Sequence, residues 1–121
     1  MDSTEFEKLV AKAIDSLPEE FRERMENIDI VVADAPTNAQ LRHSGLKKNE
    51  TLLGLYEGVP LTQRTGGYSY TMPDKITIFQ KTIEAMCRSD ARIVTEIQRV
   101  VRHEIAHHFG IDDDRLEELG R

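Results

Sequence analysis

Two histidines and a glutamate near the C-terminal end of the chain have the spacing needed for metal chemistry. They belong to the run His103-Glu104-Ile105-Ala106-His107. Four residues of α-helix turn through about 400°, so the two histidines lie one turn apart and about 40° from one another in azimuth. Glu104 is rotated by about 100° from His103, which lets it reach a water on a shared ion without binding the ion itself. Two imidazole ligands and a carboxylate general base are the parts of a zinc-dependent hydrolytic site.

The residues that follow predict a third metal ligand. Gly110 stands three positions after His107, and a glycine lets a helix end and the chain turn back. The turn would return a residue near position 113 to the ion, and a carboxylate oxygen is an acceptable zinc ligand. Asp113 is therefore the candidate, and its neighbours Asp112 and Asp114 remain alternatives.

A second interpretation of the same run needs no metal. The histidines and the glutamate would form a solvated helix face, Gly110 would cap the helix, and the aspartates would begin the next one. His108 lies about 140° from His103 on a helix, too far to share the ion easily, so we interpret it as structural.

A long helix is predicted to carry the histidines. Ser89 or Asp90 can cap its N-terminus, and it should run to Phe109. Its apolar stripe is Ile93, Val94, Ile97, Val100, Val101 and Ile105. Its polar stripe is Arg92, Glu96, Arg99, His103 and His107. The histidines thus continue the polar side, which favours ligands that face solvent over histidines buried in a core.

Hydrophobic periodicity and turn residues predict the other elements. The expected helices span residues 3–16, 19–25, 82–87 and 112–118, with Ser3 or Thr4 capping the first. The expected strands span residues 28–33, 52–59 and 75–80, and residues 34–50 are expected to form a loop. Residues 76–79 are a candidate edge strand along which an extended peptide could bind.

Composition limits the classes of function. A chain of 121 residues, with 39% hydrophobic and 31% charged residues, is typical of one globular domain. A net charge of −6 argues against non-specific binding of nucleic acid. The single cysteine, Cys87, cannot form an internal disulfide, which suits the cytoplasm. We see neither a signal peptide nor an apolar run long enough to cross a membrane.

The motif and two further segments resemble a known family. The run from His103 to Leu116, residues 52–61 and residues 73–79 are similar to the minimal zincin-like metallopeptidases of small bacterial proteins. The resemblance implies an α+β fold, in which a small mixed sheet packs against the active-site helix and N-terminal helices complete a single domain, residues 1–121. It also implies Zn²⁺ bound by His103, His107 and Asp113, with Glu104 as the general base and a peptide or protein as substrate.

This sequence differs from larger zincins in the part of the chain that follows the motif. Eight residues follow Asp113, and no methionine follows Met86, so neither a Met-turn nor a second wall of the cleft is expected. We therefore expect an open, shallow site that a protein partner could complete. Two alternatives to a peptidase stay open: a non-catalytic zincin-fold binding or regulatory module with a structural or absent metal, and a metallohydrolase that acts on a small amide.

Overall fold

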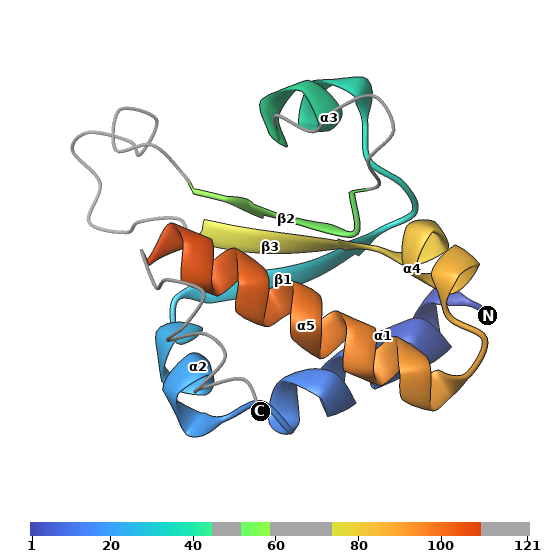
Figure 1. Ribbon diagram of the computed structural model, residues 1–121, viewed down its shortest axis with the longest axis horizontal. Helices are drawn as coiled ribbons and strands as arrows, with labels where there is room; N and C mark the ends of the chain where they lie inside the picture. The colour runs from blue at the N-terminus through green and yellow to red at the C-terminus, as the bar shows by residue number, and fades with distance from the viewer. Residues whose placement is uncertain (45–51, 59–73, 110–121) are drawn as a thin grey trace.

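The computed structural model of the protein describes residues 1–44, 52–58 and 74–109 (Figure 1). The helices are α1 (Ser3–Asp15), α2 (Glu19–Arg24), α3 (Asn38–Ser44), α4 (Gln80–Met86) and α5 (Asp90–His108). The strands are β1 (Ile28–Ala33), β2 (Gly54–Glu57) and β3 (Asp74–Phe79). Nearly all of these elements coincide with predicted ones to within one or two residues. The helix predicted over residues 112–118 lies outside the described residues.

The three strands form a mixed sheet in the order β1-β3-β2. Strand β1 pairs with β3 in parallel, Ile30 opposite Ile76, and β2 pairs with β3 in antiparallel, Tyr56 opposite Ile76. The prediction that residues 76–79 form a sheet edge is therefore wrong, because β3 is the central strand of the described sheet. Ile76, Thr77, Ile78 and Phe79 are all buried, as expected for a strand covered on both faces.

The helices cover the two faces of the sheet unequally. Of the described helices, α1, α2 and α5 lie on one side of the sheet and α3 lies on the other (Figure 1). The larger core joins Ile76 and Ile78 of β3 to Phe6 of α1 and Ile97 of α5. A smaller cluster on the opposite face joins Phe79 to residues of β2 and α3. This arrangement confirms an α+β fold with a small mixed sheet against the long helix.

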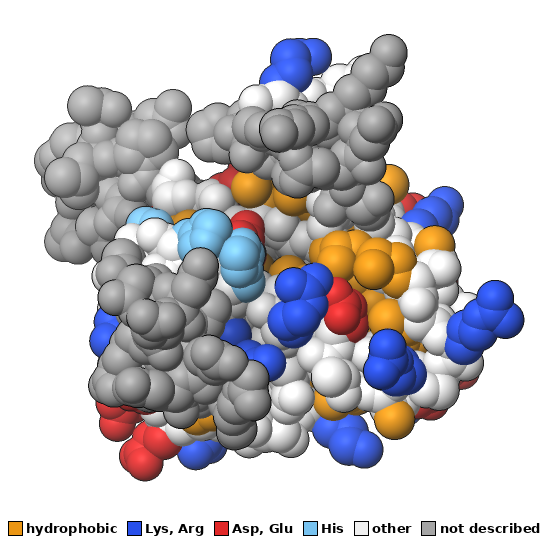
Figure 2. Space-filling model, viewed as in Figure 1, with side chains coloured by type: hydrophobic (Ala, Val, Ile, Leu, Met, Phe, Trp, Pro, Cys, Tyr) orange, Lys and Arg blue, Asp and Glu red, His pale blue; other side chains and the backbone are white. Residues whose placement is uncertain are grey.

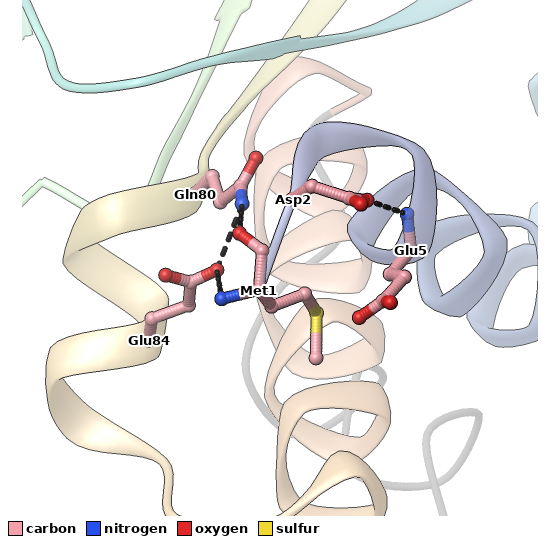
Figure 3. Close-up of polar contacts among 5 residues, drawn as sticks. All are labelled: Met1, Asp2, Glu5, Gln80 and Glu84. Atoms are coloured by element: carbon pink, nitrogen blue, oxygen red, sulfur yellow. Dashed lines mark hydrogen bonds and ion pairs between the residues drawn. The ribbon is translucent and has the colours of Figure 1, made fainter.

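Met1 and Asp2 form polar contacts with residues of two helices, α1 and α4 (Figure 3). Asp2, rather than the predicted Ser3 or Thr4, caps α1 by accepting a 2.8 Å hydrogen bond from the backbone N–H of Glu5. The side chain of Gln80 donates hydrogen bonds to the carbonyl oxygen of Met1 at 3.0 Å and to Glu84 at 2.8 Å. Helix α4 is thereby tied to the start of α1.

Helix α3 occupies part of the segment that the sequence analysis predicts to be a loop. The backbone N–H of Gln40 donates to the Thr37 hydroxyl at 3.0 Å, and the backbone N–H of Thr37 donates to Gln40 Oε1 at 3.0 Å. This reciprocal pair is a capping box, and its sequence pattern is the Thr-x-x-Gln of residues 37–40. The local prediction is wrong because one cap and one apolar side chain, Leu41 against the second cluster, suffice for a helix this short.

No helix within the described parts of the chain is both long and apolar enough to cross a membrane.

Candidate metal centre

Helix α5 brings the two predicted metal ligands together on the protein surface. Its N-terminus is capped by the Ser89 hydroxyl, which accepts a hydrogen bond from the Arg92 N–H at 3.2 Å, as predicted. The centroids of the His103 and His107 rings are 4.0 Å apart and the ring planes are tilted by 47°. Both side chains are exposed. Figure 2 shows histidine side chains gathered on one face of the molecule, with an acidic side chain beside them.

This geometry fits the two-histidine part of a zinc site. The imidazoles are one helical turn apart, close enough to bind one ion, and open to solvent from which an ion can enter. The third predicted ligand, Asp113, and its alternatives Asp112 and Asp114 lie outside the described residues. Within residues 1–44, 52–58 and 74–109, no group of three or more histidine, cysteine, aspartate or glutamate side chains could hold a metal ion.

Glu104 lies beside the histidines but faces the sheet. It follows Ile97 by seven residues and Val100 by four, so it extends the apolar row of α5 and not the polar row that ends in the histidines. Its side chain is half-buried, and its Oε1 accepts a 3.0 Å hydrogen bond from the backbone N–H of Tyr56 in β2. The carboxylate is therefore held in one position by the neighbouring strand.

Burial also changes the acidity of this carboxyl. Desolvation raises the pKa of Glu104 above its ordinary value, and the Tyr56 hydrogen bond and the nearby His107 oppose that rise only in part. A carboxylate with a raised pKa is a better proton acceptor near neutral pH than an exposed one. Position and acidity thus both suit Glu104 to the role of a general base.

Tyr56 connects the carboxylate to the rest of the site. Its ring stacks on His108, with the centroids 3.9 Å apart and the planes within 15° of parallel. Its hydroxyl donates a 2.7 Å hydrogen bond to Asp74 Oδ2 in β3, and His108 Nε2 lies 3.9 Å from the same oxygen. The interpretation of His108 as structural agrees with these contacts. Sequence analysis missed Tyr56 and Asp74 because their roles depend on strand register, which no local pattern shows.

A glycine allows β2 to come this close to α5. A Cβ atom on Gly54 would lie 2.5 Å from Val100 Cγ1 and 3.2 Å from the carbonyl oxygen of Thr77. Any side chain at position 54 would therefore push β2 away from the helix. The contact between Tyr56 and Glu104, two residues further along the strand, depends on this approach.

Comparison with known proteins gives a family and a fold. The family model for zincin-like metallopeptidases matches residues 25–121. A solved structure of a conserved hypothetical protein from Thermus thermophilus superimposes with a TM-score of 0.55 at 16% sequence identity. That similarity covers 90% of this chain and 94% of the other, and at this identity it supports the fold alone. No curated protein matches the sequence.

Proposed function

We propose, since this chain belongs to the zincin-like metallopeptidase family, that it is a zinc-dependent peptidase in which Glu104 is the general base. His103, His107 and Asp113 would hold the Zn²⁺ ion. The observation that carries the proposal is the position of Glu104, fixed by the Tyr56 N–H next to two exposed imidazoles one helical turn apart. A solvated polar helix face would not require a half-buried carboxylate of raised pKa beside the histidine pair.

The chemistry divides between the metal and the chain. A bound zinc ion would lower the pKa of its water to about 7 and polarise the scissile carbonyl. Glu104 Oε2 is the oxygen not bonded to the Tyr56 N–H, so it is the atom that would take the proton of the attacking water. The same carboxyl would then pass the proton to the amine that leaves. The Tyr56 N–H keeps the carboxylate in place during both transfers.

Among the described strands, β2 is the sheet edge nearest to this carboxylate. The N–H of Tyr56 points to Glu104 and away from β3, so the outer edge of β2 faces the site. An extended peptide that paired with the outward backbone groups of β2 other than the Tyr56 N–H would pass beside Glu104, and such strand addition is a common way for a peptide to bind a sheet. We therefore propose a peptide or a protein segment in extended conformation as the substrate.

The first experiment separates metal binding from catalysis. The wild-type protein, His103→Ala and Glu104→Gln are loaded with zinc and desalted, and zinc is measured by elemental analysis. We expect about one zinc per chain in wild type and Glu104→Gln, and a loss of zinc in His103→Ala. Hydrolysis of a peptide library should fall by about 10²–10⁴-fold in Glu104→Gln. Glu96→Gln, the same change two turns earlier on α5, is the matched control and should retain activity.

The third ligand is tested in the same assay. Asp112→Ala, Asp113→Ala and Asp114→Ala differ only in the position of the removed carboxylate, and we expect zinc to be lost in Asp113→Ala alone. Undiminished hydrolysis by Glu104→Gln would refute its role as general base. Stoichiometric zinc without hydrolysis of any peptide in the library would instead support a binding module.

A further inference from the structure

A groove runs between α1 and the outer edge of β1. Its volume is about 660 Å³. Its floor is apolar, with Val10, Ala11 and Ile14 contributed by α1 and residues 30–32 contributed by β1. The α1 residues recur at spacings of one, three and four, so they form one face of the helix. Val31 is among the β1 residues that line the groove and is 38% exposed.

The backbone beside this groove has no pairing partner among the described residues. Strand β1 pairs with β3 on one side only and is an edge of the described sheet, at the opposite edge from β2 (Figure 1). In a parallel pair, alternate residues direct their N–H and C=O groups away from the partner strand. No described backbone group bonds to the outward groups of residues 29–33. An occupant in extended conformation can satisfy these groups and place alternate side chains in the groove.

The rim of the groove is negatively charged and favours a positively charged occupant. Glu7 and Asp15 stand at the two ends of the α1 face, both are exposed, and neither forms an ion pair with a described residue. Among the described residues that line the groove, these two carboxylates carry the charge. No lysine or arginine is among the described residues that line it. A basic occupant complements this rim.

A second copy of this chain fits the rim poorly. Pairing of β1 with β1 of another copy would bring two α1 helices together on the same side of the joined sheet. Glu7 and Asp15 of one copy would then face the same carboxylates of the other, and each chain already carries a net charge of −6. Like charges brought together in this way oppose association.

We propose that this groove binds a basic, extended segment of a partner protein, which is added to the sheet as a strand beside β1. The inference does not rest on the proposed peptidase activity, because the metal centre is next to β2 at the other edge of the sheet. The bound segment would place apolar side chains over Val10 and Ile14, and its lysines or arginines would face the rim carboxylates.

The test uses three short peptides with blocked ends. The first alternates valine with lysine, the second replaces every lysine with glutamate, and the third is the lysine peptide with a central proline that prevents strand pairing. Binding is measured by fluorescence anisotropy at low salt, and the site is located by amide chemical shifts. We expect the lysine peptide to bind at least about ten-fold more tightly than the other two and to shift the amides of β1 and α1.

Three double variants, one of them a control on α2, test the rim. Glu7→Lys/Asp15→Lys reverses the two rim charges and should lower the affinity for the lysine peptide by about ten-fold or more. Glu19→Lys/Glu23→Lys makes the same change in net charge on α2 and should bind like wild type. Glu7→Gln/Asp15→Asn removes the rim charges without reversing them, so it should lower the affinity for the lysine peptide less than the charge reversal does. It tests the rim even if the charge reversal disturbs folding.

Three outcomes would overturn the proposal. One is equal binding of the lysine and proline peptides, because strand addition cannot explain it. Another is a set of shifts confined to β2 and α5, which would place the peptide at the metal centre. The third is concentration-dependent dimerisation of the free protein with shifts in β1, which would identify a second copy as the occupant.

Discussion

Replacement of Gly54 by alanine tests the close approach of β2 to α5 with one added methyl group. That methyl would lie 2.5 Å from Val100 Cγ1 and 3.2 Å from the carbonyl oxygen of Thr77. The first distance requires a side chain to move, and the second opposes a shift of the methyl toward β3. Val100 itself is buried, so it has little room to give way. We expect β2 to move outward and the Glu104–Tyr56 hydrogen bond to lengthen.

The size of the effect follows from two opposing contributions. Overpacking of a filled core by one methyl group costs about 1–3 kcal/mol. Alanine in place of glycine also restricts the unfolded chain, which returns about 0.4–1 kcal/mol. The mid-range values of about 2 and about 0.7 kcal/mol leave a fall in the free energy of unfolding of about 1.3 kcal/mol, which lowers the melting temperature by about 4–8 °C for a domain of this size.

Gly58 provides the matched control for this substitution. A Cβ atom there would lie 3.6 Å from the nearest described atom, Asp74 Oδ1, which is an ordinary contact. Neither glycine has a left-handed φ, so the two alanine variants differ mainly in packing. Thermal and urea unfolding, followed by circular dichroism, should show Gly58→Ala equal to wild type or slightly more stable. If Gly54→Ala is as stable as Gly58→Ala, the close approach of β2 does not constrain position 54 and the reasoning fails.

Three further perturbations test the surroundings of the site. Tyr56→Phe removes the hydrogen bond to Asp74 and should lower the free energy of unfolding by about 1 kcal/mol in urea titrations, without loss of zinc. Glu104 has a raised pKa when folded, so its ionisation costs stability above that pKa. In zinc-free protein, Glu104→Gln should therefore unfold at higher urea than wild type at pH 8, and this gain should disappear toward pH 4. Burial, and to a lesser extent Glu96, raises the pKa of Cys87, so iodoacetamide should alkylate this thiol more slowly in folded than in urea-unfolded protein at pH 8.

Each of these expectations has a result that would contradict it. An unchanged urea midpoint in Tyr56→Phe would mean that water replaces the lost hydrogen bond without cost. A stability gain in Glu104→Gln that is the same at pH 4 and pH 8 would show that packing, and not ionisation, is responsible. Equal alkylation rates in folded and unfolded protein would show that the Cys87 thiol is not desolvated.

The histidine pair is predictable because its geometry is local. Helical spacing alone places His103 and His107 on one face, and the polar row that they extend predicts their exposure, which the structure confirms. The half-burial of Glu104 can also be predicted from the sequence, because Glu104 continues the apolar row of Ile97 and Val100 on the same helix. The hydrogen-bond donor that holds Glu104 cannot be predicted in this way, because the Tyr56 N–H reaches the carboxylate only through the packing of β2 on α5.

The order of the strands cannot be derived from the strands themselves. The sequence indicates three strands at nearly the right residues, but it places the edge at residues 76–79, which are central. An apolar run predicts burial without specifying which neighbours provide it. Helix α3 was missed for a different reason, because its capping box at Thr37 and Gln40 is present in the sequence and is outweighed there by polar composition.

The packing of α1 against α5 has a consequence for biosynthesis. The main core joins Phe6 and Val10 of α1 to Ile97 and Ile105 of α5, so it is complete only when both ends of the fold are present. On the ribosome, about ninety residues would leave the exit tunnel before α1 could pack against α5. Contacts between residues so distant in sequence form late, after the entropy of the intervening loop has been lost. The histidine pair would enter the folded protein in this step, so a nascent chain would acquire its candidate metal ligands only once α5 has packed against α1.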